Sequence, residues 1–333
     1  QREVRQFVQS LSTRGDPIAT LIHLETELDD LRVLLRRWQW DQPDYPISDP
    51  RNFVGGGGQH IADQLIDCFK RKAKFLDKRS AHLDEGYTLD LSTDLFPSDL
   101  VRWWKKLPEL GKYLEQITAL NIDNSRFNVD TQGLLKDVEQ LRHLSARKCQ
   151  LTRLPEGIGN MHMLETLRLS DNLIELTVAD VERLRNLTRL ESLRLDGNPL
   201  GRAVNVERMP RLKVLSLNNT GIDGWPEGIF KKRRPRGFFL DMQRNPISRI
   251  PEVTAGSDHA LLIARTRLDA EDLSEANRLA YHEYRRSVGI DPQHYYSNLA
   301  EQDLALWRLS GMTFWGTSES GRGTFRREAW HDL

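Results

Sequence analysis

Several features that define common classes of protein are absent from this sequence. No run of about 18 uninterrupted apolar residues occurs, so no segment is expected to span a membrane. The 48 basic residues are matched by 48 acidic ones, which removes the bulk electrostatic attraction that nucleic-acid binders use. There is no H-E-x-x-H, Walker-type or clustered His/Cys motif. We therefore expect no catalytic residue in this chain, and no metal, cofactor or nucleic-acid partner.

Cysteine is also scarce. Cys68 and Cys149 are the 2 cysteines among 333 residues, too few for a disulfide framework or a four-ligand zinc site. Cys68 falls on the apolar side of a predicted helix, and Cys149 falls at an inward position of a repeat. Both are interpreted as structural, because a nucleophilic cysteine needs exposure and a neighbouring base.

The start of the chain lacks a methionine. The first residue is Gln1, and the residues after it contain no apolar core of a signal peptide. We expect the chain to be a piece of a longer polypeptide.

The strongest positive signal is an internal repeat. The pattern L-x-x-L-x-L-x-x-N-x-L, typical of leucine-rich repeats, occurs in six copies, with a weaker opening strand expected at Leu89 and Leu91. The spacing of the copies lies inside the roughly 20–29-residue period of this class. The copies begin at Ile117, Leu141, Leu164, Leu190, Leu212 and Gly237, and their asparagine positions hold Ser125, Cys149, Asn172, Asn198, Thr220 and Asn245.

Each copy predicts a short strand followed by a return on the other side of a solenoid. The first, fourth and sixth positions point inward, and alternation leaves the third, fifth and seventh positions facing solvent. The asparagine side chain can bond the backbone where the chain leaves the strand, and Cys or Thr fills the same place with fewer hydrogen bonds. Pro and Gly in segments 154–159 and 225–229 predict turns. The predicted fold class is an α/β solenoid, a leucine-rich-repeat horseshoe.

Helices are predicted before the repeats. Asp16-Pro17 is a typical helix start, and apolar residues recur every three or four positions from Ile18 to Trp38. The segment 41–58, rich in Pro and Gly, predicts a loop. A second helix is expected over 61–76, with a basic opposite side. We interpret these helices as a cap on the first repeat.

Helices are also predicted after the repeats. One is expected over 258–267 and a longer one over 269–288, closed by Gly289. The sequence therefore predicts a helical N-terminal cap with a possible first strand (1–110), the repeats (111–256) and a helical C-terminal segment (257–333).

A basic run over 231–236 is similar to an anion-binding or nuclear-localisation patch. It falls on the predicted convex side of the last repeat, where a solvated run of charges is the ordinary interpretation. We favour that interpretation.

The strand face is the predicted binding surface, because solenoids usually bind partners there. Its outward positions form columns of mixed charge and hydrogen-bonding groups, which suit a protein partner better than apolar association does. Three arginines lie near the middle of this face, with aspartates around them. The predicted partner-binding residues are Asn121, Asp123, His143, Ser145, Arg147, Arg168, Ser170, Arg194, Asp196, Ser216, Asn218, Phe239, Asp241 and Gln243.

This layout resembles a known family. A helical segment precedes short repeats, the repeats carry an L-P-x-x-I turn at 154–158, and a helical segment with Tyr295-Tyr296-Ser297-Asn298 and the run 303–307 follows. The chain looks like the leucine-rich-repeat region and the start of the catalytic domain of bacterial NEL-type (novel E3 ligase) ubiquitin ligase effectors.

The resemblance implies a division of labour. In that family the repeats select the protein substrate and hold the ligase in check, and a following helical domain takes ubiquitin from a charged E2 on the Cys of a Cys-x-Asp motif. Neither Cys68 nor Cys149 is followed by that pattern, so this chain is expected to be inactive alone, with E2-ubiquitin bound by a catalytic part beyond Leu333. The resemblance also implies a secreted effector that acts in the host cytoplasm. One alternative is a stand-alone leucine-rich-repeat scaffold or adhesion module without ligase activity. Another is an enzyme fragment whose C-terminal helices contribute to a site that is completed elsewhere.

Overall fold

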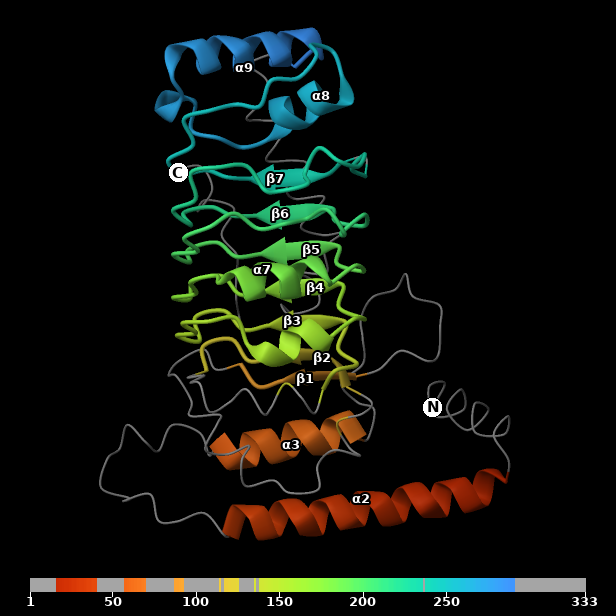
Figure 1. The fold of residues 1–333 in the computed structure, drawn as a ribbon. Helices are drawn as coiled ribbons and strands as arrows, with labels where there is room; N and C mark the ends of the chain where they lie inside the picture. The colour runs from red at the N-terminus through yellow and green to blue at the C-terminus, as the bar shows by residue number, and fades with distance from the viewer. Residues whose placement is uncertain are drawn as a thin grey trace, which may run out of the picture.

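The described part of the molecule is a stack of short strands with helices at both ends (Figure 1). The computed structural model describes residues 16–40, 57–69, 87–92, 114, 117–125, 135, 138–235 and 237–290 of the 333-residue chain. Within these ranges, no helix is both long and apolar enough to cross a bilayer.

Seven parallel strands form one sheet, in which each strand pairs with the next one along the chain. Their central leucines, such as Leu120, Leu144 and Leu167, are register partners from strand to strand. This register confirms all six predicted copies, and the pairing of Leu89 with Leu120 confirms the opening strand. The strands are β1 (Tyr87–Asp90), β2 (Ile117–Asn121), β3 (His143–Ser145), β4 (Thr166–Arg168), β5 (Ser192–Arg194), β6 (Val214–Ser216) and β7 (Phe239–Asp241).

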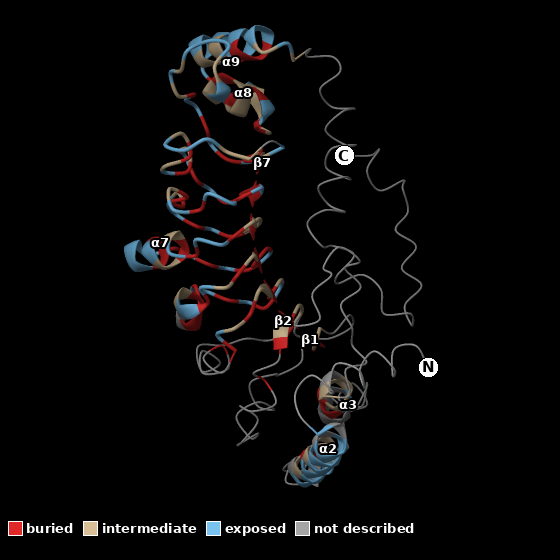
Figure 2. Ribbon diagram, turned by 90° about the vertical axis from the view of Figure 1, so that its right-hand side faces the viewer, coloured by how far each residue is buried: buried red, intermediate tan, exposed pale blue. Residues whose placement is uncertain are grey.

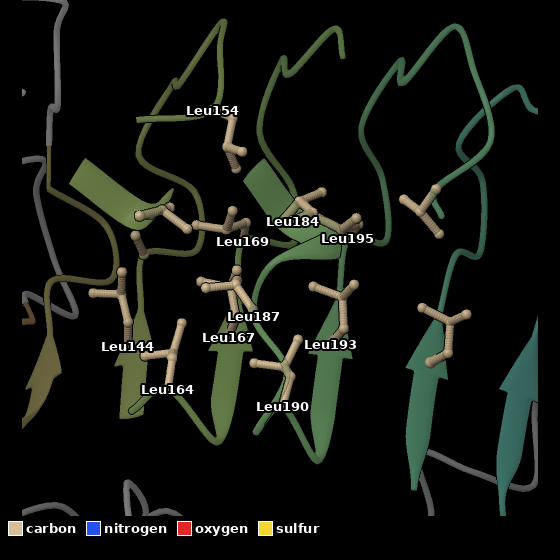
Figure 3. Packing of buried hydrophobic residues seen from close by; sticks show 14 of the residues in the cluster. Leu144, Leu154, Leu164, Leu167, Leu169, Leu184, Leu187, Leu190, Leu193 and Leu195 are labelled. Carbon is tan, nitrogen blue, oxygen red and sulfur yellow. The ribbon is translucent and has the colours of Figure 1, made fainter. Parts of the chain in front are cut away.

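The leucines of each repeat pack on those of the next. Buried residues, red in Figure 2, recur along the strands and along the returning chain of each coil. Each repeat buries its apolar side only against its neighbours, so the stability of the stack comes from contacts between coils. Figure 3 shows part of this layer, in which the fully buried leucines of two adjacent coils include Leu164, Leu167, Leu169, Leu190, Leu193 and Leu195.

Buried asparagines join the coils by hydrogen bonds. The side-chain oxygen of Asn172 accepts from the backbone N–H groups of Cys149 (2.8 Å) and Leu151 (3.2 Å). Its Nδ2 donates to the carbonyls of Ala146 and Leu169, both at 2.8 Å. One amide therefore satisfies backbone groups of its own coil and of the preceding one, which an apolar side chain could not do. Asn198 and Asn245 make the same kind of contacts in their own coils.

Cys149 and Thr220 fill the same buried position in other coils. Cys149 Sγ donates to the carbonyl of Ile122 at 3.0 Å, and Thr220 Oγ1 donates to the carbonyl of Leu217 at 2.9 Å. Both side chains are buried and make fewer hydrogen bonds than Asn172, as the repeat pattern predicts. The structural interpretation of Cys149 is thereby confirmed, whereas the side chain of Cys68 lies outside the described part.

Two helices lie at the N-terminal end of the stack, α2 (Pro17–Trp40) and α3 (Gly57–Phe69). Asp16 Oδ1 accepts a hydrogen bond from the N–H of Ile18 at 2.9 Å, which confirms the predicted helix start. The loop predicted over 41–58 is wrong at its end, because α3 begins at Gly57.

The apolar stripe of α2 is only partly buried, contrary to the prediction of one packed face. Leu31 and Leu35 are buried, but Ile18 is 69% exposed. The reason is length: α3, which packs between α2 and β1, has 13 residues against 24 in α2. The longer helix therefore extends beyond its neighbour.

At the other end, the chain covers the open edge of β7. The N–H of Arg267 donates to the carbonyl of Leu240, and the N–H of Met242 donates to the carbonyl of Arg267, both at 2.9 Å. These bonds satisfy groups that an edge strand would leave open to another chain. The segment around Arg267 lies between α8 (Asp258–Arg265) and α9 (Glu275–Ser287), which pack on each other.

The helix predicted over 269–288 is shorter than expected. A 3-10 turn, η4 (Ala270–Asp272), comes first, and α9 begins after Ser274, whose hydroxyl accepts from the N–H of Asn277. Ser274 starts the helix at this later point, because its hydroxyl accepts a hydrogen bond from an N–H group of the first turn that has no partner within the helix. Gly289, at φ 74°, ends the helix as predicted.

On the side of the stack opposite the strands, the returns include η3 (Glu156–Asn160) and α7 (Val178–Arg185) (Figure 2). The basic run lies on the return between β6 and β7, where Lys231, Lys232 and Arg233 are exposed as expected, whereas Arg234 is half-buried and has a structural role. Arg234 donates to four backbone carbonyls, those of Val206, Met209, Gly228 and Ile229. Its guanidinium therefore fastens two consecutive returns together.

The asparagine network can be tested by comparing two Asn→Ala variants. Asn172→Ala removes its side-chain hydrogen bonds in the buried interior and is expected to lower the free energy of unfolding by about 2–4 kcal/mol. Asn160→Ala, which removes one exposed bond to Glu139, is expected to cost less than about 1 kcal/mol. Urea unfolding followed by circular dichroism measures both. Equal losses would contradict the structural role given to Asn172.

Candidate recognition face

The predicted columns do lie side by side across the sheet. At the fifth position, Ser145 is the register partner of Arg168, and Arg168 is the register partner of Arg194. The pairing continues in both directions, so each predicted column is one row of side chains along the stack. The complete fifth-position column is Asn121, Ser145, Arg168, Arg194, Ser216 and Asp241.

The prediction that these positions face solvent is wrong for most of the third and fifth columns. Arg168 is 4% exposed, Ser145 1% and Ser192 3%. Strands about 4.8 Å apart hold the side chains of a column against one another, so short polar groups are covered by their neighbours. Alternation along a strand predicts which face a residue lies on, but it does not predict how much of that residue is exposed. The predicted site residues that are buried are Asn121, Ser145, Arg168, Ser170, Ser216 and Asp241.

The accessible part of the face is the seventh position with a few members of the other columns. Arg147 retains 40% exposure of its side chain. The half-buried members of the predicted site are Asp123, His143, Arg147, Arg194, Asp196, Asn218, Phe239 and Gln243.

Asp123 holds the next strand in place. Its Oδ1 accepts from the hydroxyl of Ser145 and from the backbone N–H of Arg147, both at 2.7 Å. Burial raises the pKa of the Asp123 carboxyl above its usual value, against the lowering effect of these hydrogen bonds and of Arg147 and Arg168. The carboxylate therefore orders two consecutive positions of the face.

Asp196 repeats this arrangement three strands further on. Its Oδ1 accepts from the hydroxyl of Ser216 and from the backbone N–H of Asn218 (3.2 Å), while its Oδ2 accepts from the hydroxyl of Ser170 (3.0 Å). In both cases the aspartate bonds the fifth and seventh positions of the next coil, which are Ser145 and Arg147 for Asp123 and Ser216 and Asn218 for Asp196. The aspartates at the seventh position therefore act as fixed acceptors between coils.

At the C-terminal end of the sheet, Asp241 is buried beside Arg267. The Arg267 guanidinium lies 3.4 Å from its carboxylate, and the N–H of Gln243 donates to it at 3.0 Å. Burial raises the pKa of Asp241, while Arg267 opposes that shift. Asp241 thus serves the closure of the sheet edge more than an exposed recognition face.

Arg168 lies at the centre of the face among charged neighbours. Burial lowers the pKa of its guanidinium to about 9, and the positive charge of Arg194 adds to this effect. The pKa stays above neutral pH, so Arg168 is a cation there.

The eighth position, which the repeat pattern did not predict as part of the face, forms a row that is exposed at Lys148, Asp171, Asn219 and Arg244. A non-glycine residue at this position takes a positive φ in five coils, and Gly197 takes 66° in the remaining one. A side chain at Gly197 would bring its Cβ within 2.8 Å of Asp171 Oδ1. Asn, Asp and Gly favour a positive φ, so their recurrence at this position was the sequence signal that could have predicted this row. The row is Asn124, Lys148, Asp171, Gly197, Asn219 and Arg244.

The described residues of this face form no candidate metal site. Among the described residues, no three His, Cys, Asp or Glu side chains gather in the way that metal ligands do. The arrangement consists of hydrogen-bonding and charged groups held in fixed positions.

Comparison with known proteins gives leucine-rich-repeat relatives. No family model matches the chain. The human volume-regulated anion channel subunit LRRC8A is 26% identical over 140 residues, which are 42% of this chain, and the rat protein matches to the same extent. The matched region spans 17% of the length of these curated relatives.

Three solved structures are also similar. They are a leucine-rich-repeat protein of Leptospira interrogans (19% identity, 48% of this chain, 44% of that chain, TM-score 0.37), the Arabidopsis receptor kinase HAESA (16%, 73%, 42%, 0.45) and internalin C2 of Listeria monocytogenes (15%, 56%, 80%, 0.36). The leucine-rich-repeat fold of this chain follows from its own strand register and buried asparagine positions.

The raised pKa of Asp123 predicts a pH-dependent effect of Asp123→Asn. The folded protein holds this proton to a higher pH than the unfolded chain does, so stability falls as pH rises from the ordinary pKa through the raised one. Asparagine can accept the same two hydrogen bonds, and because it is uncharged it avoids the free-energy cost of burying a carboxylate. The stability of Asp123→Asn relative to wild type should therefore increase between pH 3 and pH 7.

Urea unfolding at several pH values measures this difference. Asp223→Asn, at an exposed position of the same solenoid, is the matched control. A constant difference, or one that favours wild type at pH 7, would contradict the prediction.

Proposed function

We propose that this chain is a protein-recognition module whose strand face binds a protein partner. One observation carries the proposal: the polar side chains of the face are held in register by hydrogen bonds between coils, as at Asp123 and Asp196. Groups that are already ordered lose little conformational entropy on binding, which favours recognition of a specific partner. The half-buried residues Arg147, Arg194, Asn218, Phe239 and Gln243 are the proposed contact surface.

The charge of this surface also supports a protein partner. Arginines and aspartates both occur along the stack, so the face presents both signs within a few strands. Such a pattern selects a partner by charge complementarity more than by total apolar area. A nucleic acid, which carries one sign throughout, would meet repulsion at Asp123 and Asp196.

We propose further that the module belongs to a bacterial NEL-type E3 ubiquitin ligase effector. In that protein it would select the protein substrate and hold the ligase in check. The support is the sequence layout of helices, repeats with an L-P-x-x-I turn, and a helical C-terminal segment. In this proposal α2 and α3 form the N-terminal cap, and 257–333 begins the ligase domain. E2-ubiquitin would bind outside this chain, and the whole protein would act in the host cytoplasm.

The alternative is a leucine-rich-repeat scaffold or adhesion module with no ligase. The open reading frame that encodes this chain distinguishes the two proposals. A Cys-x-Asp motif in an adjoining helical domain supports the ligase, and its absence from the whole frame supports the scaffold.

Site-specific photo-crosslinking tests recognition through the strand face. A photo-reactive residue at Asn218, on the face, is expected to capture a defined protein partner, whereas the same residue at Lys232, on the opposite side, should not. Arg147→Glu combined with Arg194→Glu should reduce capture at Asn218 by about tenfold or more, since reversed charges repel a complementary partner. Both arginines are half-buried, so the double variant is expected to fold, which circular dichroism checks.

The matched control is the exposed pair Arg153→Glu and Arg202→Glu, which should leave capture unchanged. Equal capture at Asn218 and Lys232, or capture that survives reversal of Arg147 and Arg194, would contradict the proposal.

The environment of Cys149 predicts that it accepts no ubiquitin. Burial raises the pKa of its thiol to about 12, and Sγ donates to backbone carbonyls instead of facing solvent. Incubation with E1, E2, ubiquitin and ATP should yield no adduct that a reducing agent cleaves. Cys149→Ala and Cys68→Ala variants assign any adduct to its cysteine. A thioester on either residue would contradict a pure recognition role for this chain.

A further inference from the structure

The first two turns of α2 leave apolar side chains open to solvent. Ile18 is 69% exposed, Ile22 60% and Leu21 39%. These side chains are three and four positions apart, so they form one ridge on the helix surface, which we call the α2 patch. Figure 1 shows α2 running past α3 at this end, whereas Leu31 and Leu35, further along the helix, are buried.

The α2 patch differs from a single exposed apolar residue, which is ordinary on a protein surface. Leu279, for example, is 66% exposed on α9, but the residues one turn away from it are Glu275 and Glu283 on that helix. Contiguous exposed apolar side chains instead mark a site of interaction. The α2 patch is therefore a candidate docking surface at the N-terminal end of the stack.

Acidic side chains border the α2 patch. Glu25 follows Ile22 by three positions and Asp29 follows it by seven, so both lie on the side of α2 that carries the patch. Both are exposed, and Asp29 also forms a surface ion pair with Arg32 at 2.9 Å. Over residues 16–31 the sequence has no Lys or Arg, and its carboxylates are Asp16, Glu25, Glu27, Asp29 and Asp30.

This negative charge disfavours two kinds of occupant. An anionic lipid surface would be repelled by the carboxylates. A second copy of the chain would bring like charges together in either direction of packing. In a parallel pair of α2 helices Glu25 would face Glu25, and in an antiparallel pair centred on Leu21 it would lie near Asp16 of the other copy.

We propose that α2 is a second docking site of this protein and takes a basic amphipathic helix of another protein. Apolar residues of that helix pack on the α2 patch, and a Lys or Arg about one turn further along reaches Glu25. The apolar contact supplies the burial, and the opposite charges at its border fix the register of the two helices. The site is separate from the strand face, so this inference goes beyond the proposed function.

Selection of helical peptides displayed on phage against the full chain tests the inference. A photo-reactive residue at the exposed Thr26, one turn after Ile22, identifies the peptides that bind here. They should share apolar residues at helical spacing, followed about one turn later by Lys or Arg. Ile22→Ser combined with Glu25→Lys should weaken their binding about tenfold or more in fluorescence anisotropy, because the apolar contact and the charge pair are both lost.

The matched control is Leu279→Ser combined with Glu283→Lys on α9, at the other end of the stack. These positions are also exposed, and they make the same exchange of an apolar and an acidic residue one turn apart. The control should leave the affinity of the peptides unchanged. Circular dichroism confirms that both double variants are folded.

The outcomes also identify the other occupants. Crosslinks from Thr26 to another segment of the same chain, or to a second copy, would show that the α2 patch is already filled and would overturn the inference. Enrichment of acidic peptides, of no peptide that crosslinks to Thr26, or of peptides that bind the Ile22→Ser, Glu25→Lys variant equally well would overturn it too. Crosslinking at Asn218 tests the strand face independently, so failure at α2 leaves the proposed function intact.

Discussion

The structure depends on the requirement that every buried backbone group find a hydrogen-bond partner. A solenoid coil leaves its strand through the interior, where water cannot reach the freed N–H and C=O groups. Asn172, Asn198 and Asn245 satisfy these groups in their own coil and in the preceding one. The leucine layers can then stack at the spacing of the sheet. The regular positions of the polar face, on which the proposed recognition depends, follow from this interior.

The polar side chains of the face, like the buried backbone groups of the core, are held by hydrogen bonds between coils. Asp123 and Asp196 do not project freely into solvent, because each accepts a backbone N–H of the next coil and a serine hydroxyl. Side chains that would otherwise be flexible are therefore part of the fold. The consequence is a face whose half-buried polar residues lie in fixed surroundings.

The repeat pattern predicted the strands, their register, the asparagine positions and the structural role of Cys149, since each of these depends on residue type at a fixed spacing. It did not predict exposure. Arg168 was expected to face solvent and is buried, because exposure depends on neighbours from several coils at once. The pattern also missed the eighth position, where the residue type depends on backbone conformation more than on hydrophobicity. It did not predict the exposure of Ile18 at the start of α2, which follows from the shorter length of α3. The predicted division into cap, repeats and C-terminal segment stays a prediction.

Hydrogen exchange of single backbone amides tests the central claim most directly. The N–H groups of Cys149 and Thr220 bond to buried asparagine oxygens, and those of Arg147 and Asn218 bond to the aspartates of the face. If interior and face form one hydrogen-bonded unit, all four amides should exchange as slowly as those of the central strands, at rates set by cooperative opening of the stack. Slow exchange at Cys149 and Thr220 with fast exchange at Arg147 and Asn218 would contradict a face that is ordered before a partner binds.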